Sequence, residues 1–245
     1  MLHTHATQGK TWELPRIRGH KIEVSPFFLI ICGLFVLIGL NSYTNFLHQL
    51  MWAPVLFFSI LLHELGHAAA TKHHGFGTSR IVLHGMGGVA ISKRGHTSPK
   101  QGMSISLAGP AVTAALAIVF GIIYLLVGPL LASTGNYALS VVLFFIQLMA
   151  VANLFLLILN LLPVFPLDGG QTLMHFLRRK SSEVAALEKA LKVSLGTIAV
   201  VGVLVLLLFP GSGIFILFIF AMLGYSNWKT LEQIKTAGGR PIRFQ

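Results

Sequence analysis

The chain has 245 residues, of which 54% are hydrophobic and only 10% are charged, and its mean hydropathy is +0.78. This composition excludes an ordinary water-soluble globular domain, in which about a quarter of the residues are charged. The net charge of +11 would suggest a nucleic-acid partner in a soluble protein, but the basic residues lie between apolar runs and form no single patch. We therefore expect a lipid bilayer, and no nucleic acid, as the surroundings of this chain.

Six apolar segments follow a polar N-terminus, and most of them approach the roughly 20 residues that a helix needs to cross a bilayer. The predicted fold class is an all-α polytopic membrane protein with about six transmembrane helices. The expected helices are 26–43, 51–71, 103–127, 137–162, 193–209 and 214–228. The predicted organisation is a cytoplasmic N-terminal segment over 1–25, a six-span membrane core over 26–228 and a short cytoplasmic tail over 229–245.

The last two apolar segments are short and are separated by Pro210-Gly-Ser-Gly213, which is typical of a tight turn between two helices. The alternative is one long kinked helix, which would give five spans. Ahead of them, residues 181–192 are typical of a short amphipathic helix at the inner membrane surface or of a solvated connector.

The positions of the 18 lysines and arginines predict the orientation of the chain. Three linkers contain no lysine or arginine: 44–50, 128–136 and 210–213. By the positive-inside rule, these linkers face outward and both termini are cytoplasmic, in a multi-pass protein of the cell (inner) membrane. In this orientation, His63 and His67 lie toward the cytoplasmic end of the second segment, and the fourth segment ends on the same side just before Asp168.

The second segment contains the motif His63-Glu-Leu-Gly-His67. Residues four apart on a helix share a face and lie about 6 Å apart along the axis, so both imidazoles can bind one tetrahedral ion. Glu64 can reach a water on that ion without being a ligand, and can take its proton because the pKa of such a water on zinc is ~7. The alternative is a structural role, although a buried glutamate beside two histidines in an apolar run needs partners.

Asp168 is the only aspartate in the chain, and we expect it to be the third ligand of one Zn²⁺, whose fourth position stays open. The alternatives are a helix N-cap or a turn residue before Gly169. Pro163 and Pro166 should end the fourth helix and unwind the backbone ahead of Asp168. Five other histidines lie in polar linkers and are expected to be solvated or structural: His73, His74, His84, His96 and His175.

Two asparagines of the fourth segment, Asn153 and Asn160, lie seven residues apart on nearly the same helix face. Either could hydrogen-bond a substrate carbonyl or its oxyanion. The alternative is a hydrogen bond between helices. For Asn160 the two roles are equally favoured, and for Asn153 the interhelical hydrogen bond is favoured over substrate binding.

Between the second and third segments, residues 80–92 contain two short β-branched stretches on either side of the glycines in 85–88. This pattern predicts a β-hairpin or re-entrant element near the inner membrane surface. An exposed strand edge there could bind an unfolded peptide by strand addition. The alternative is an amphipathic surface loop without a role in substrate binding.

Four motifs, in this order and spacing, resemble the site-2 protease family of intramembrane zinc metalloproteases in its compact bacterial or archaeal form. They are Leu62-His-Glu-Leu-Gly-His-Ala68, Gly87-Gly-Val-Ala90, Ala108-Gly-Pro110 and the stretch from Asn160 to Gly169. The resemblance runs from about Trp12 to Leu173. One departure is Thr113, where many relatives carry asparagine. We expect no PDZ insertion, for which the linkers are too short, and no C-terminal CBS pair, for which residues 229–245 are too few.

The resemblance implies one Zn²⁺ held by His63, His67 and Asp168, with Glu64 as the general base. It further implies that Asn160 helps to position the scissile peptide and that the hairpin at Gly87 and Gly88 pairs with the substrate. The family is known for regulated intramembrane proteolysis, so the implied substrates are transmembrane segments of membrane-anchored proteins. The sequence gives no oligomeric state.

Two other functions use the same residues. A membrane metal transporter or metal-sensing protein could employ the His/Asp set as a transport site, but the predicted outer ends contain no ionisable residue except His48, which favours a one-sided site. A catalytically silent relative could bind membrane segments only, yet all four residues of the motif set are intact. We therefore expect a zinc-dependent intramembrane endopeptidase.

Overall fold

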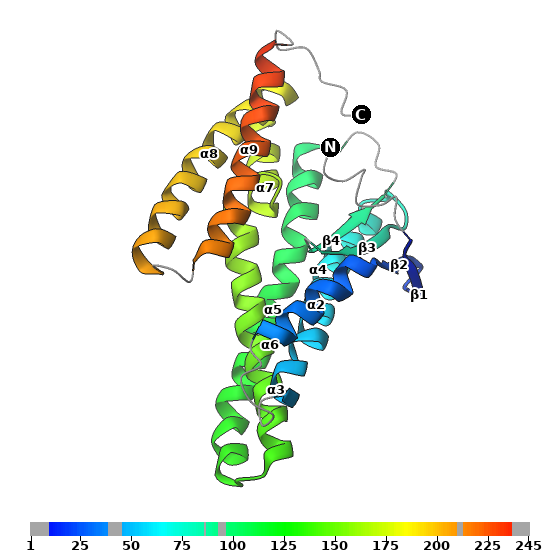
Figure 1. Cartoon of the computed structure of the whole chain (residues 1–245). Coiled ribbons are helices and arrows are strands. Elements are labelled where there is room, and N and C mark those ends of the chain that lie inside the picture. Colours follow the sequence, from blue (N-terminus) through cyan, green and yellow to red (C-terminus); the bar gives the residue numbers. More distant parts are fainter. Residues whose placement is uncertain (1–9, 39–45, 86, 93–96, 210–212, 237–245) are drawn as a thin grey trace. The chain divides into compact units, whose positions relative to one another are not determined.

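The computed structural model describes residues 10–38, 46–85, 87–92, 97–209 and 213–236, and shows a mainly helical chain with one small β-sheet (Figure 1). The chain divides into two compact units. Unit 1 comprises residues 1–95 and 108–157, and unit 2 comprises residues 96–107 and 158–245.

The sheet belongs to unit 1 and has four strands in the order β1-β2-β3-β4. Their bounds are β1 (Trp12–Ile17), β2 (His20–Val24), β3 (Arg80–His84) and β4 (Gly87–Ile91). Strands β1 and β2 form one antiparallel hairpin, β3 and β4 form another, and β2 pairs with β3 in parallel. The hairpin predicted over 80–92 is therefore confirmed, but as half of a larger sheet.

The N-terminal hairpin was not predicted, because residues 12–24 were expected to form only a polar segment. Arg18 and Gly19 both have positive φ, 51° and 89°, as the two central residues of a type I′ hairpin turn require. Strand β2 is buried along most of its length because it pairs with β3 as well as with β1. Because β2 contains His20, Lys21 and Glu23, its hydropathy did not predict this burial.

Five helices lie wholly or largely in unit 1. They are α2 (Pro26–Ile38), α3 (Phe46–Leu50), α4 (Trp52–His73), α5 (Pro99–Ser133) and α6 (Tyr137–Leu161), of which residues 99–107 of α5 and 158–161 of α6 belong to unit 2. The sheet packs against α2 and α4 through a core that includes the fully buried Ile81 and Leu83 of β3. A second core joins α4 to α6 through Val55 and Met149. Helix α4 is thus held on both sides within this unit.

Unit 2 contains α7 (Asp168–Leu177), α8 (Glu183–Leu208) and α9 (Ile214–Thr236). Helices α8 and α9 lie side by side (Figure 1) and share apolar cores that include Leu191, Leu231 and Phe220. Helix α8 is capped by Ser182, whose hydroxyl accepts a hydrogen bond from the Ala185 N–H. Both predictions for 181–192, a separate amphipathic helix and a solvated connector, were wrong, because residues 183–192 form the start of α8 and continue unbroken into its apolar part. Residues 210–212 of the predicted turn lie outside the described residues.

Four of the described helices are long and apolar enough to cross a membrane. They are Phe46–His73, Pro99–Ser133, Tyr137–Leu161 and Glu183–Leu208. The chain is thus a helical membrane protein with four candidate spans. The first predicted span corresponds to a shorter apolar helix, and α9 is not among the four.

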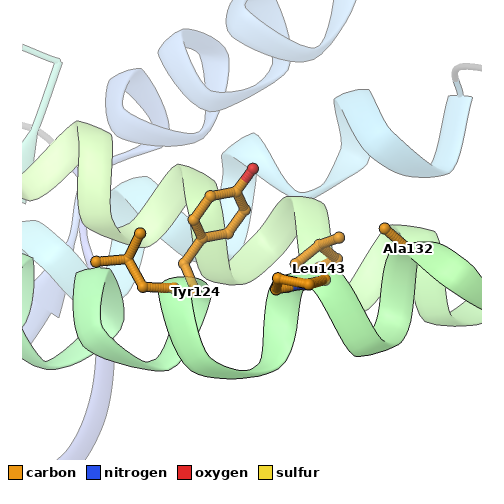
Figure 2. A pocket seen from close by; sticks show the side chains of 6 residues that line it. Tyr124, Ala132 and Leu143 are labelled. Carbon is orange, nitrogen blue, oxygen red and sulfur yellow. The ribbon is translucent and has the colours of Figure 1, made fainter.

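Large apolar side chains of these helices point outward, as they must if lipid surrounds them. Leu125, Leu126 and Leu130 of α5 are about three-quarters to two-thirds exposed, at 74%, 75% and 68%. A hollow of about 280 Å³ in the same region is lined by Tyr124, Leu125, Gly128, Pro129, Ala132 and Leu143 (Figure 2). Apart from the Tyr124 ring, this lining is aliphatic, and the hollow offers no group that could bind a metal or move a proton near neutral pH.

Candidate metal centre

Two histidines of α4 face each other inside unit 1. His63 and His67 are 7% and 8% exposed, and their Nε2 atoms lie 3.1 Å apart. Two imidazole nitrogens bound at 2.0–2.1 Å to one tetrahedral zinc would lie about 3.4 Å apart. The structure therefore brings the two imidazoles together as the motif predicted, with their Nε2 atoms next to each other.

Glu64 is also buried, at 6% exposure, and its side chain lies against strand β4. A methyl carbon added at Gly88 would lie 2.4 Å from Glu64 Cγ and 2.9 Å from Glu64 Oε1. The backbone of β4 therefore passes directly beside the glutamate. Gly87 has φ of +124°, a conformation that only glycine adopts without strain.

Helix α5 approaches the histidines from another direction through Gly109. A methyl carbon at this position would lie 2.3 Å from His67 Nε2 and 2.7 Å from His63 Nε2. A second close contact lies one residue away, where a methyl carbon at Gly66 would lie 2.7 Å from the Ala108 carbonyl oxygen. Neither Gly66 nor Gly109 was predicted to have a role in the site. A glycine in a helix interior costs about 1 kcal/mol relative to alanine, and this cost could have indicated a close contact at each position.

Asp168 is the first residue of α7, in unit 2, and is 7% exposed. Helix α6 ends at Leu161, so the expectation that Pro163 and Pro166 end this helix ahead of the aspartate is confirmed. Leu167, with extended backbone, occupies the N-cap position, which leaves Asp168 in the first turn. A carboxylate is stabilised there by the helix dipole.

Protein groups form hydrogen bonds with the irregular backbone over 162–167. The Phe165 N–H donates to Ser194 Oγ at 2.7 Å, and that hydroxyl donates to the Pro163 carbonyl at 3.2 Å. Gln171 Nε2 donates to the Pro166 carbonyl at 2.8 Å. Gly169 and Gly170 leave no room for a side chain against this loop, so the start of α7 is fixed on it.

The described residues therefore include a His/His/Asp set, His63, His67 and Asp168, whose members are all buried and each offer one ligand atom. Among the alternative histidines, His73 is exposed and His74 and His84 are half-buried, while His96 lies outside the described residues. His175 is buried instead of solvated, and its Nδ1 lies 3.2 Å from Arg178 Nη1. It packs over Gly102 in unit 2.

The two asparagines of α6 differ in their surroundings. Asn153 is fully buried, and its Nδ2 donates to Ser59 Oγ of α4 at 2.9 Å and to the Met149 carbonyl at 2.8 Å. The hydrogen bond to Ser59 is the interhelical contact of the alternative, and the one to Met149 lies within α6. Asn160 is half-buried, and its role in substrate binding stays a prediction. Thr113 is buried and donates to the Pro110 carbonyl within its own helix at 2.9 Å.

An ion cluster around the buried Glu23, which was not predicted from the sequence, stabilises the sheet that contains β4. The Glu23 carboxylate, 1% exposed, accepts hydrogen bonds from Arg80 Nε at 2.6 Å and Arg80 Nη2 at 2.5 Å. Lys21 Nζ lies 3.0 Å away, and Thr11 Oγ1 donates at 2.7 Å. The Arg80 hydrogen bonds, above all, lower the pKa of Glu23 to about 2. This cluster ties β2 to β3, the neighbour of β4.

Residues 125–208 match the family model described as Peptidase family M50. The chain is 33% identical over 178 residues to the zinc metalloprotease MJ0392 of Methanocaldococcus jannaschii, covering 70% of this chain and 48% of that protein. It is 31% identical over 180 residues to the putative zinc metalloprotease Rip3 of Mycobacterium tuberculosis, covering 69% and 44%. The chain thus spans about half the length of these curated relatives.

Among solved structures, the site-2 protease from Methanocaldococcus jannaschii superposes with a TM-score of 0.61 at 21% identity, over 96% of this chain and 98% of that one. This likeness establishes a shared fold. The segment that matches the family model includes Asp168, and the relatives and the fold agree with the zinc-protease motif around His63. The chain therefore belongs to the site-2 protease family, peptidase family M50.

Proposed function

We propose that this chain is a zinc-dependent intramembrane endopeptidase that cleaves transmembrane segments of membrane-anchored proteins, as in regulated intramembrane proteolysis. The observation that carries the proposal is the pair His63 and His67 of α4, whose Nε2 atoms lie 3.1 Å apart. Glu64 of the same helix is buried with its side chain beside strand β4. The names of the curated relatives, which are zinc metalloproteases, support it.

One Zn²⁺ would be held by His63 and His67 of unit 1 and Asp168 of unit 2. The donor set fits zinc, because two imidazole nitrogens and one carboxylate oxygen are among its ordinary ligands and three protein ligands leave one position open. The separation of the two Nε2 atoms supports this fit. When bound, zinc polarises a carbonyl and lowers the pKa of a coordinated water to about 7.

Glu64 would act as the proton carrier of the reaction. Its carboxylate accepts the proton of the attacking water and later donates it to the leaving amine. The position of its side chain directly beside Gly88 supports this role, because it places the carboxylate next to the strand that would bind the substrate. Asn160 would donate a hydrogen bond to the oxyanion from its Nδ2.

Strand β4 would bind the substrate by strand addition, with Gly87 and Gly88 at the point of contact. It is the last strand in the sheet order and pairs with β3 on its other side. A peptide added there runs beside Gly88 and therefore beside Glu64. A transmembrane helix must unwind to bind in this way, which exposes the peptide bond to attack.

We further propose six spans with both termini in the cytoplasm of a cell (inner) membrane, with the protease core over 26–228. The distribution of lysine and arginine among the linkers supports this orientation. Helices α2 and α9 would then supply the first and last spans. A cytoplasmic site at the inner ends of α4 and α6 would release a cleaved regulator to the cytoplasm.

The test is cleavage of a panel of single-span substrates by purified protein in detergent, comparing the wild type with Glu64→Gln at matched zinc content. We expect zinc-dependent cleavage by the wild type and a loss of at least about 10²-fold in the variant, because glutamine keeps the shape but cannot carry the proton. Zinc bound by both proteins with no cleavage by either would contradict the proposal and favour metal transport or sensing.

A further inference from the structure

Gly109 stands in the interior of α5 directly before Pro110, where both residues weaken the helix. Glycine costs about 1 kcal/mol relative to alanine in a helix interior, and proline removes a backbone hydrogen bond. Two helix-weakening residues in succession within a 35-residue helix indicate that a close contact excludes a larger side chain at this point. At Gly109, this contact is with the two histidines.

The space in front of the Gly109 Cα lies within reach of both imidazoles. A methyl carbon there would lie 2.3 Å from His67 Nε2 and 2.7 Å from His63 Nε2. Nitrogen atoms bind zinc at 2.0–2.1 Å, so such a carbon would lie nearly as close to both nitrogens as an ion that they share. No rotation of the methyl group relieves this contact, because Cβ is fixed by the backbone.

The backbones of α4 and α5 lie close together at the same level, so an added carbon at Gly109 fits only if the imidazoles are displaced or the two helices move apart. Gly66, which lies between the two histidines in sequence, packs on the Ala108 carbonyl, from which a methyl carbon would lie 2.7 Å. Val112 Cγ2, one turn further along α5, would lie 2.9 Å from the same carbon. The α5 backbone therefore forms a fixed wall on one side of the histidine pair.

We propose that Gly109 is a positioning residue for the metal. Its missing side chain keeps open the space against α5 in which an ion bound by His63 and His67 is held, and Gly66 holds the α5 backbone at the distance that closes this side of the space. The inference rests on the proposed zinc site, and it adds a wall residue that is not a ligand.

The experiment compares Gly109→Ala with Gly121→Ala in the full chain, purified in detergent, stripped with a chelator and titrated with Zn²⁺. Gly121 lies in the same helix, and a methyl group there contacts nothing within 4 Å, so both variants gain the same helix propensity. We expect wild-type affinity for Gly121→Ala and a loss of at least about tenfold for Gly109→Ala, the scale seen when groups around a metal site are altered. Wild-type affinity in Gly109→Ala would overturn the proposal.

Titration with Co²⁺ gives a second readout, because its visible absorption reports on imidazole ligation. We expect the wild-type spectrum for Gly121→Ala and an altered or absent spectrum for Gly109→Ala. If Gly109→Ala has both the wild-type spectrum and the wild-type affinity, the added carbon does not reach the ion bound by His63 and His67.

A combined variant keeps the test decisive if Gly109→Ala folds poorly. In chelated protein, the stability lost through Gly109→Ala should be largely recovered in a background that carries both His63→Ala and His67→Ala, because removal of both rings removes the overlaps at 2.3 Å and 2.7 Å. If Gly109→Ala costs as much stability in that background as in the wild type, the proposal is overturned, since the contact would then lie elsewhere.

The failure of this inference is distinguishable from the failure of the proposed function. A wild-type protein that binds no Zn²⁺, or a His63→Ala variant that binds as well as the wild type, refutes the metal site itself. Loss of Zn²⁺ in His63→Ala together with full retention in Gly109→Ala refutes only the role of Gly109.

Discussion

At the scale of single residues, glycine determines how closely backbone approaches the reactive side chains. Gly88 of β4 lies against Glu64, and Gly109 of α5 lies against the two histidines. Each glycine lets a main chain pass where any Cβ would collide. The geometry of the site thus depends on two residues that carry no functional group, in addition to the four that do.

Gly88→Ala should lower cleavage by at least about tenfold while zinc content stays at the wild-type level. The added carbon would lie 2.4 Å from Glu64 Cγ, and displacement of a catalytic group by about 1 Å can lower the rate about 10²-fold. The measurement is kcat on a single-span substrate with zinc determined on the same samples. Gly33→Ala in α2, where a methyl group contacts nothing within 4 Å, is the control, and equal rates in both variants would contradict the prediction.

At the scale of elements, two polar connections hold the pieces that carry the site within unit 1. Asn153 joins α6 to α4 through Ser59, one helical turn before His63. Glu23 joins β2 to β3 through Arg80. Both connections lie between segments that are far apart in the sequence, and both are buried at their centre.

Asn153→Ala should destabilise the protein, because it removes the hydrogen bonds that Asn153 Nδ2 donates to Ser59 and Met149. Cleavage by the folded fraction should stay largely intact, because the same amide has no donor left for a substrate. Double-mutant cycles on such interhelical pairs average about 0.6 kcal/mol. The measurement is a cycle of Asn153→Ala and Ser59→Ala in unfolding free energy, with kcat per folded molecule. A large fall in kcat at unchanged stability would instead support the predicted substrate contact of Asn153.

The Glu23 cluster should make stability depend on pH in the acid range. The pKa of Glu23 falls from its ordinary 4.5 to about 2, so its contribution is fully present above pH 4.5 and is lost as the pH falls toward 2. Unfolding of the wild type and of Glu23→Gln, measured in detergent between neutral and low pH, should show a stability difference that is constant above pH 4.5 and shrinks below it. A difference that stays constant down to the lowest pH would contradict this prediction.

At the scale of the whole molecule, the chain combines a helical membrane protein with a small sheet built from two hairpins. Four of the described helices meet the length and hydropathy of a span. The sheet uses residues on both sides of α2 and α4 in sequence, because β2 precedes these helices and β3 follows them. A set of membrane-length helices and a sheet that ends in strand β4 therefore occur in one short chain.

The proposed orientation predicts which linkers are reachable from outside the cell. In a Cys32→Ala background, Thr134→Cys should react with a membrane-impermeant maleimide added to intact cells, while Ser181→Cys should react only after the membrane is opened. The reason is that the linker at 128–136 contains no lysine or arginine, whereas the one after α7 is basic. The reverse pattern of labelling would show the opposite topology.

The sequence by itself determined the features that depend on near neighbours. Helical spacing placed His63 and His67 on one face, prolines ended α6 at Leu161, and the β-branched stretches around Gly85 formed a hairpin. These features follow from local geometry and backbone chemistry, in which a few adjacent residues suffice.

Only the tertiary structure decided the contacts between distant segments. The parallel pairing of β2 with β3, the approach of β4 to Glu64 and that of Gly109 to the histidines join segments that are remote in the chain. Many registers and packings are compatible with one local pattern, and the choice among them comes from burial and close packing summed over the whole unit. A glycine in the sequence therefore indicates that some close approach is possible, and the fold alone determines what it approaches.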